Sequence, residues 1–565
     1  MKLRFLLLLS VQALILVQGV RAAAPTAGDW VTGGGDNGHS GLSTEVGPAT
    51  ATVLWDVPSF GMPGNALLAV GSRVLRVGLV QTTSFSHVVI ECHDLGTGAL
   101  NWSVALPFDG TSQGAGRCLG ADHGRLYASR GARIRGFDIA TGVETWISAD
   151  SFAIDYWEDA VFTPEGDLIV DTESSIHRVR ASDGTTAWTT VRPGSGVGGQ
   201  GVALRGNSIY AHQSSGAGAE ILELDVATGA IVASSGPLGG AFTRSAPFLG
   251  PGGMVYAAYT SAQPGSIVAL RDEGAGFSTR WTTPTAAAGS VNLRYAVGPD
   301  GSVYHVAAGF VVRRLDAQSG AVLAQSAPIP VQGSYGDFRL TVDALGRVYV
   351  SNGGFASFGR LFAFDRELAT LWSTVVSDVA YGGPILAQDG TLLVARGSGI
   401  VAYRVPRTPT QVYCAGDGSA SACPCNAGFP GNGCPNSAQP GGARLESEGV
   451  ASVAADSFRL RALAMPDTTC LYAQGTGRRN GGLGAAFGDG LACLDGTIVR
   501  LGIRAASGGT SLYPGAGGVP ISIQGQVPAS AGVTRTYQVW YRNPAAFCTP
   551  AAFNLTNGLE APWSP

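Results

Sequence analysis

The chain has 565 residues, of which 45% are hydrophobic and 13% charged, and its net charge is −4, so it can fill more than one core beneath a lightly charged surface. This balance excludes the strongly basic surface on which nucleic-acid binding depends. The 83 glycines and 30 prolines require frequent turns, which favours many short strands over long helices.

The first 22 residues have the pattern of a secretory signal peptide. Lys2 and Arg4 form a short basic region, residues 5–20 are mostly apolar, and small residues follow. We expect cleavage near Ala22 and export of the mature chain; an uncleaved anchor is the alternative. No later apolar run reaches the roughly 18 residues that a membrane-spanning helix needs.

A motif that runs from an aspartate through a tight turn to a tryptophan recurs along residues 94–404. Its clearest copies are DLGTGALNW (94–102) and DIATGVETW (138–146). The copies begin at residues 94, 138, 180, 225, 272, 316 and 365, with Arg180 replacing the aspartate in the third and a degenerate eighth position at Arg404. Intervals of 39 to 49 residues between starts indicate a repeat architecture.

Each repeat contains four strand-like stretches, which is the size of one β-propeller blade. Gly/Asp turns followed by alternating Val, Ile and Tyr, as in PDGSVYHVA (299–307), are typical of tight antiparallel connections. Residues 381–405 supply only three strands, and ATVLWDVPS (51–59) supplies an isolated fourth strand that carries Trp55. We therefore predict eight blades over residues 23–405, the last one composite; seven blades with a loose N-terminal strand is the alternative.

The residues of the motif have structural reasons to recur. An aspartate side chain accepts backbone N–H groups across a tight turn, a glycine permits positive φ, and a tryptophan offers a flat surface for packing between blades. We therefore interpret the following residues as structural docking residues and not as catalytic groups: Asp94, Trp102, Asp138, Trp146, Trp188, Asp225, Asp272, Trp281, Asp316, Asp365, Trp372 and Trp55.

This motif resembles the tryptophan-docking motif of the eight-bladed PQQ-like propellers, which include the quinoprotein alcohol dehydrogenases and the outer-membrane assembly factor BamB. The resemblance covers about residues 30–405 and implies the propeller fold. The quinoprotein enzymes also hold their quinone with a disulfide between adjacent cysteines, a stacking tryptophan and a Ca²⁺ ligated by Glu, Asn and Asp. This chain has no Cys-Cys pair and no Cys-x-x-Cys-His haem sequence, so we predict neither PQQ nor calcium as a cofactor.

The last quarter of the chain has a different composition. A linker and a Cys/Gly-rich segment (406–441) precede strand-like stretches over 442–565, which predict a small β-sandwich or jelly-roll-like domain. The pieces GCPNS (433–437), YQVWYRNP (537–544) and FCTPAAFNLTNG (547–558), with the stretch from Cys470 to Cys493, resemble a C-terminal module of exported planctomycete-type bacterial proteins. The resemblance implies a source and a location at the cell envelope, and no activity.

Nine cysteines fit an oxidising compartment. We predict a Cys470–Cys493 disulfide across a hairpin-length segment, and a Cys92–Cys118 disulfide between neighbouring blades. The spacing of Cys414, Cys423, Cys425 and Cys434 is also compatible with zinc, but disulfides fit an exported chain better. The pairing among these four cysteines and Cys548 stays open. The odd number leaves at least one thiol without an intramolecular partner.

No catalytic or metal-binding motif accompanies the repeats. The seven histidines are scattered without a His-x-His or His-Glu-x-x-His spacing, and Gly-x-Ser-x-Gly is absent. We predict an exported, non-catalytic binding or scaffolding protein with a protein or glycan partner at the cell envelope, and a C-terminal domain for adhesion, anchoring or sorting. The alternative is a propeller enzyme, either a degenerate quinoprotein dehydrogenase or a polysaccharide-active enzyme, with its site at the channel mouth.

Overall fold

The computed structural model describes residues 28–564, except 60–62, 82–85, 108–115, 153–158, 173, 194–200, 216–217, 243–245, 261–264, 286–294, 331–336, 354–358, 377–382, 397, 405–409, 454–456, 516–517, 530–531 and 544–546. The predicted signal peptide lies outside the described residues. The chain divides into two compact units, Met1–Arg404 and Val405–Pro565.

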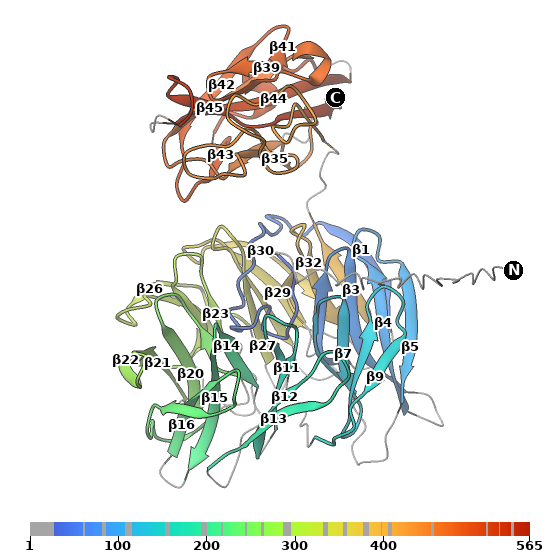
Figure 1. Cartoon of the computed structure of the whole chain (residues 1–565), viewed down its shortest axis with the longest axis vertical. Coiled ribbons are helices and arrows are strands. Elements are labelled where there is room, and N and C mark those ends of the chain that lie inside the picture. Colours follow the sequence, from blue (N-terminus) through green and yellow to red (C-terminus); the bar gives the residue numbers. More distant parts are fainter. Residues whose placement is uncertain are drawn as a thin grey trace, which may run out of the picture. The chain divides into compact units, whose positions relative to one another are not determined.

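The described part of the first unit contains eight antiparallel sheets, each of which is one propeller blade (Figure 1). Blade 1 consists of β2 (Pro63–Val70), β3 (Arg73–Gln81), β4 (Ser86–Asp94) and β5 (Leu100–Leu106). Blade 2 consists of β6 (Arg117–Asp122), β7 (Arg125–Ser129), β8 (Ile134–Asp138) and β9 (Glu144–Ile147). Blade 3 consists of β10 (Val161–Phe162), β11 (Leu168–Asp171), β12 (Ser175–Val179) and β13 (Thr186–Val191).

The next four blades repeat this order. Blade 4 consists of β14 (Val202–Arg205), β15 (Ser208–Ser215), β16 (Gly218–Asp225) and β17 (Ile231–Ser234). Blade 5 consists of β18 (Ala241–Phe242), β19 (Phe248–Leu249), β20 (Met254–Thr260), β21 (Ser266–Asp272) and β22 (Phe277–Pro284), with β18 and β19 both paired to β20. Blade 6 consists of β23 (Ala296–Val297), β24 (Val303–Ala307), β25 (Val311–Leu315) and β26 (Val322–Gln325). Blade 7 consists of β27 (Asp337–Val342), β28 (Val348–Gly353), β29 (Gly359–Phe364) and β30 (Thr370–Val376).

The eighth blade is composite. It contains β31 (Ile385–Leu386), β32 (Leu392–Arg396) and β33 (Gly399–Tyr403), and its outermost strand is β1 (Val53–Pro58) from the start of the chain. β1 runs antiparallel to β33, and Trp55 pairs with Ala402. The all-β propeller fold with closure by an N-terminal strand is therefore confirmed, and the seven-bladed alternative is wrong.

Burial explains why these sequences form blades. Inner strands such as β24 have every residue buried, because both faces of each sheet pack against neighbouring blades. Outermost strands such as β5 alternate exposed and half-buried residues, with one face toward solvent. The apolar clusters lie between successive sheets; one joins Leu75 and Ile90 of blade 1 to Leu126 and Phe137 of blade 2.

The repeated tryptophans join each blade to the next. The indole N–H of Trp102 donates to the carbonyl of Ile139 at 3.0 Å, and its ring covers Gly142 in the same turn of the next blade. The acceptor is the carbonyl of the second residue of the motif in the next blade. The same hydrogen bond joins Trp55 to Leu95, Trp146 to Ala181, Trp188 to Val226 and Trp281 to Ala317. Trp372 donates instead to the carbonyl of Pro48 at 3.2 Å.

The aspartates of the motif accept hydrogen bonds within their own turns. Asp138, for example, accepts the backbone N–H and the hydroxyl of Thr141.

Blades 4 and 6 lack the docking tryptophan, and the motif turns of the blades that follow them differ in structure from the other copies. Blade 4 has Ala233 at that position, and a Cβ on Gly274 of the next turn would meet nothing within 4 Å. Blade 6 has Ala324, and the next turn places Leu368 at φ +64°, where the other copies have glycine. Leu368 is 2% exposed and packs in the cluster that includes Ala324, so it fills space that an indole occupies elsewhere.

We expect Gly142→Ala to lower the free energy of unfolding by about 1–3 kcal/mol more than Gly274→Ala. Both glycines have positive φ, so both variants carry the same backbone strain, but the new Cβ at position 142 would lie 2.7 Å from the Trp102 ring. Urea unfolding of both variants measures the difference. Equal losses would show that the indole does not constrain the turn.

The second unit is a β-sandwich. Its larger sheet contains β34 (Gln411–Tyr413), β46 (Gly558–Trp563), β44 (Val533–Arg542), β37 (Thr469–Gly475) and β42 (Val499–Ala505), with β45 (Phe553–Leu555) paired to β44. Its smaller sheet contains β35 (Arg444–Glu448), β36 (Arg459–Leu463) and β43 (Ser511–Tyr513). A core with Leu460, Tyr472 and Tyr537 joins the two sheets. The short remaining elements are β38 (Gly477–Arg478), β39 (Ala485–Phe487), β40 (Gly490–Ala492), β41 (Leu494–Asp495), the 3₁₀ turn η1 (Arg479–Gly482) and α1 (Ile521–Gln524).

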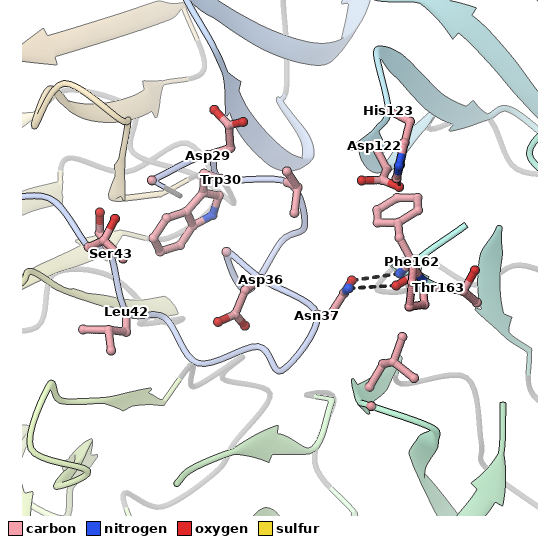
Figure 2. A pocket seen from close by; sticks show the side chains of 17 residues that line it. Asp29, Trp30, Asp36, Asn37, Leu42, Ser43, Asp122, His123, Phe162 and Thr163 are labelled. Carbon is pink, nitrogen blue, oxygen red and sulfur yellow. Dashed lines mark hydrogen bonds and ion pairs between the residues drawn. The ribbon is translucent and has the colours of Figure 1, made fainter. Parts of the chain in front are cut away.

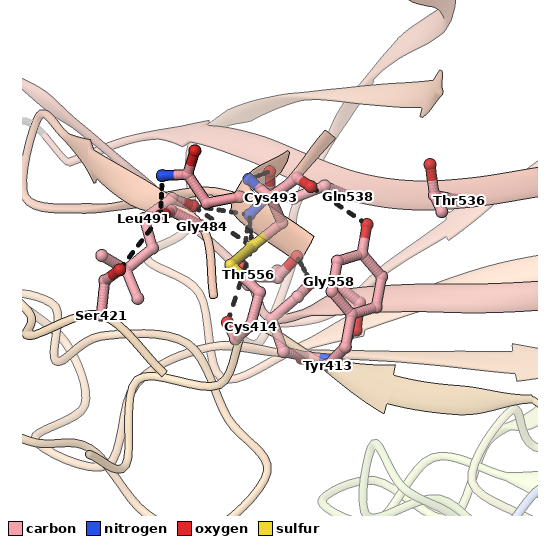
Figure 3. Close-up of a disulfide and its surroundings, with 12 residues drawn as sticks. Tyr413, Cys414, Ser421, Gly484, Leu491, Cys493, Thr536, Gln538, Thr556 and Gly558 are labelled. Carbon is pink, nitrogen blue, oxygen red and sulfur yellow. Dashed lines mark hydrogen bonds between the residues drawn. A yellow bond between two sulfur atoms is a disulfide. The ribbon is translucent and has the colours of Figure 1, made fainter. Parts of the chain in front are cut away.

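The prediction of a Cys470–Cys493 disulfide is wrong. Cys493 bonds to Cys414 (Figure 3). Cys470 is a buried free thiol. The physical reason is the direction of the side chains: Cys470 lies on β37 and faces the sandwich core, whereas Cys493 packs with Tyr413 and Cys414 in a separate small cluster. The other disulfides, which the sequence left open, are Cys423–Cys434 and Cys425–Cys548.

The predicted Cys92–Cys118 disulfide is also absent from the described residues. Both cysteines are buried free thiols in the apolar cluster between blades 1 and 2. Sheets that pack face to face lie about 10 Å apart, whereas a disulfide needs Cα atoms within about 4.4–6.8 Å. Adjacent blades therefore bring these residues into one core without bonding them.

Candidate functional site

The segment of residues 28–47 runs around one end of the propeller axis and contacts the blades in turn. The N–H of Trp30 donates to the carbonyl of Ala69 at 2.7 Å, and the carbonyl of Val31 accepts the N–H of Ala121 at 2.8 Å. Further bonds join the segment to the innermost strands of blades 3 to 7, at Phe162, Leu204, Leu249, Val297 and Val342. Gly28 lies against blade 8, since a Cβ there would be 3.0 Å from the Cα of Gln388. We call residues 28–47 the axial segment.

Asn37 shows how closely this segment fits. Its side chain donates to the carbonyl of Phe162 and accepts the N–H of the same residue, both at 2.8 Å (Figure 2). Its own carbonyl accepts the N–H of Leu204 at 2.7 Å. One residue thereby replaces a strand partner for blade 3 and joins blade 4. The segment forms a non-repetitive inner rim, held by blade backbones.

A pocket of about 610 Å³ opens within this rim. The axial segment provides one wall, with Trp30, Asp36 and Asn37. The turns between the first and second strands of blades 2, 3 and 4 provide the opposite wall, which includes Asp122, His123, Thr163 and Gly206. Its volume is within the range of about 300–1,000 Å³ for ligand sites. Because backbone hydrogen bonds fix both walls, the pocket is preformed.

The described lining of the pocket is acidic. It contains Asp29, Asp36 and Asp122 and no arginine or lysine. Asp36 accepts hydrogen bonds from neutral groups of the described chain, namely the N–H groups of Gly38 and Ser40 and the Ser40 hydroxyl. Asp122 is 4% exposed and contacts His123 Nδ1 at 2.5 Å. Burial raises the pKa of Asp122, and the hydrogen bond with His123 opposes this effect. The pocket therefore favours a ligand with positive charge.

A buried polar network crosses the seam between blades 8 and 1. Ser59, after β1, donates to Glu91 on β4, and His93 Nε2 lies 3.4 Å from the same carboxylate. Arg76 donates to the carbonyls of Gly399 and Arg396 in blade 8. The Ser59 hydroxyl bonds the carboxylate and not the imidazole, so the contacts are not those of a serine activated by histidine. The network holds the composite blade closed.

This network predicts loss of stability in acid. Burial disfavours the charged form of Glu91, but its hydrogen bonds with His93 and Ser59 and the charge of Arg76 hold its pKa below the usual value near 4.5. A carboxylate with a lowered folded-state pKa contributes its stability fully above about 4.5 and loses it as the pH falls through the folded value. We expect Glu91→Gln to lower the free energy of unfolding by about 1–3 kcal/mol at neutral pH. The variant should also lose less stability than the unaltered protein as the pH falls, because its amide does not titrate.

Denaturant midpoints between pH 3 and 7 measure that effect. Glu367→Gln is the matched control, because this side chain is 68% exposed and should keep the slope of the unaltered protein. An unchanged loss of stability in acid for Glu91→Gln would mean that the seam does not titrate.

The residues present do not fit the quinone and calcium site of the enzymes that the motif resembles. The three described disulfides lie in the second unit and none joins adjacent cysteines. Within the described residues, the single group of three metal-ligating side chains is Cys425, Asp489 and Cys548, and its two cysteines form a disulfide. Asp489 instead accepts hydrogen bonds from Asn543 and Thr549.

The structure places the predicted docking residues in the outer turns and strands of the blades, away from the pocket lining. The pocket residues Trp30, Asp36, Asn37, Asp122 and His123 are not among the residues that the sequence singled out. The available signal was GDWVTGGGDNGHSG (28–41), a stretch dense in glycine and polar residues that lies before the first strand and outside the repeat. Figure 2 shows Trp30, Asp36 and Asn37 on the axial segment, and Asp122 and His123 on the blade turn across from it.

For membrane association, one finding applies to the described part of the chain: it has no helix with both the length and the apolar character needed to span a bilayer.

Comparison with known proteins agrees with the propeller fold. A PQQ-like family model, described as outer membrane protein assembly factor BamB, matches residues 86–307, which lie in blades 1 to 6. No curated protein matches the sequence.

Similar solved structures include BamB from Moraxella catarrhalis, with 15% identity and a TM-score of 0.44, covering 62% of this chain and 99% of that one. The computationally designed Ika8 protein has 13% identity and a TM-score of 0.43, covering 62% and 99%. A europium-containing methanol dehydrogenase has 12% identity and a TM-score of 0.35, covering 65% and 82%. The blades show that the first unit is a β-propeller, and within it residues 86–307 are similar to the PQQ-like family model.

Proposed function

We propose that this protein is an exported binding protein that holds a protein or glycan partner of the cell envelope at the mouth of its propeller. The observation that carries the proposal is the preformed pocket, bounded by the axial segment and by the turns of blades 2 to 4. A site whose walls are already fixed binds without a large ordering cost. The family match to a BamB-like propeller supports a role in protein interaction.

Export is part of the same proposal. Residues 1–22 have the pattern of a signal peptide, and the second unit contains three disulfides, which persist in oxidising compartments. In this proposal the protein needs no quinone or calcium, and the C-terminal sandwich serves in adhesion, anchoring or sorting.

The test is retention of envelope material by the purified full-length protein, compared between two variants. Thr44 is an exposed residue of the pocket lining, so Thr44→Trp fills the opening without disturbing the core. Val191→Trp places the same ring on the outer strand β13, where the side chain is 72% exposed. We expect Thr44→Trp to lose the retained partner and Val191→Trp to keep it.

Equal retention by both variants would contradict a partner site at the pocket. Mass spectrometry and absorbance of the purified protein test the enzyme alternative. Bound quinone or stoichiometric Ca²⁺ would replace the binding proposal with a quinoprotein activity.

A further inference from the structure

The indole N–H of Trp30 has no hydrogen-bond acceptor among the residues that the structure describes. Trp30 lines the pocket, it is 3% exposed, and its Nε1 atom is buried without a partner. Trp30 differs in this respect from the five tryptophans that dock onto the next blade. Each of those indoles donates to a backbone carbonyl, as Trp55 does to Leu95 at 2.9 Å. A buried donor without an acceptor costs about 1–3 kcal/mol, so its retention in the wall of a pocket points to an acceptor supplied by a ligand.

The charged residues of the lining indicate which other chemical group the ligand carries besides this acceptor. Asp36 and Asp122 lie on opposite walls, the first on the axial segment and the second at the end of β6. No described lining residue carries a permanent positive charge to neutralise them. Leu42, Phe162 and Leu204 also line the pocket and supply apolar surface.

We propose that the pocket binds an arginine or lysine side chain of a polypeptide partner. In this proposal the Asp36 and Asp122 carboxylates attract the cationic group, and the apolar residues contact its methylene stem. The indole N–H of Trp30 donates to a carbonyl of the partner's backbone. The inference rests on the proposed function, because it names the chemistry of the partner at the same site.

A peptide satisfies this lining better than a glycan does. Arginine and lysine combine a long apolar stem with a charged end, and a peptide backbone places a carbonyl acceptor within the same residue. A neutral sugar offers acceptors but no cation. A polymer of amino sugars offers a cation without the apolar stem, and it serves as the competing arm of the test.

The experiment is calorimetric titration of the full-length protein with acetyl-Gly-Arg-Gly-amide, its lysine and glutamine counterparts, and a glucosamine oligomer. We expect the arginine or lysine peptide to bind on the order of tenfold more tightly than the glutamine peptide, since hydrogen bonds to charged groups are stronger than neutral ones. The difference should shrink as salt is added. Tighter binding of the glucosamine oligomer than of either cationic peptide would overturn the peptide assignment.

Three variants locate the contacts. Asp36→Asn and Asp122→Asn keep the shape of each side chain and should each weaken binding of the arginine peptide about five- to tenfold. Trp30→Phe keeps an aromatic ring but removes the unsatisfied N–H together with part of the indole, so it should weaken binding of the arginine peptide about fivefold and also lower the thermal midpoint through the smaller ring. A purely structural role for Trp30 would lower that midpoint and leave affinity for the peptide intact. Glu273→Gln, on the propeller surface away from the pocket lining, is the charge control and should bind as the unaltered protein does.

The two proposals fail differently. If Thr44→Trp abolishes retention of the envelope partner but arginine and glutamine peptides bind equally, the cationic assignment is wrong and the pocket is still the partner site. If Thr44→Trp affects neither retention nor peptide binding, both proposals are wrong.

Discussion

Trp55→Ala is expected to lower the free energy of unfolding by about 3–5 kcal/mol, the usual loss for a buried tryptophan, and to release the axial segment. Trp55 is 8% exposed, its N–H donates to the Leu95 carbonyl, and its ring covers Gly98 of blade 1. It is also carried by β1, the strand that completes blade 8. Loss of the ring therefore removes a docking contact at the seam between blades 8 and 1, where β1 pairs with β33.

Trp281→Ala is the matched control, because Trp281 has the same 8% exposure and donates in the same way to Ala317, but lies within the continuous chain of blade 5. Urea unfolding measures the stability of both variants, and limited proteolysis followed by N-terminal sequencing reports on residues 28–58. We expect similar losses of stability but early cleavage of those residues only in Trp55→Ala. Equal cleavage in the two variants would contradict closure through Trp55.

Replacing both Cys414 and Cys493 by alanine is expected to destabilise the second unit by about 4–5 kcal/mol, because their bond spans 79 residues of sequence and constrains the unfolded chain accordingly. For a unit of this size, such a loss lowers the melting temperature by about 10 °C or more. Calorimetry of the full-length protein measures the shift in the C-terminal transition.

The control is the double alanine replacement of Cys423 and Cys434, whose bond spans 11 residues and is expected to contribute about 3 kcal/mol. Both pairs tie the Cys/Gly-rich segment, so the comparison isolates loop length. A larger loss from the short loop than from the long one would contradict the chain-entropy explanation.

The repeat made the propeller predictable because its signal is local. The aspartate, the glycine and the tryptophan of each motif lie within nine residues, as in DIATGVETW (138–146), and each has a physical reason to stand where it does. The composite blade was predictable for a similar reason. Residues 51–59 carried the fourth-strand pattern that residues 381–405 lacked, and a propeller leaves few sheet edges unpaired.

The cysteine pairs were not predictable in this way. Cys470 and Cys493 flank a segment of hairpin length, but Cys470 faces the sandwich core from β37, whereas Cys493 packs beside Cys414 in a separate cluster. A disulfide depends on the distance and direction between two Cβ atoms, and sequence spacing does not encode either across 79 residues.

The sequence by itself determined the period, the blade motif and the strand that closes the ring, because these follow from short-range patterns of turn and packing residues. Only the tertiary structure decided the candidate site. Asp36 and Asp122 are separated by 86 residues of sequence, and they share a pocket because the axial segment hydrogen-bonds to seven inner strands in succession. Apart from the bonds of the Asn37 side chain to Phe162, these hydrogen bonds join backbone groups, which every residue carries, so the residue pattern does not predict the path.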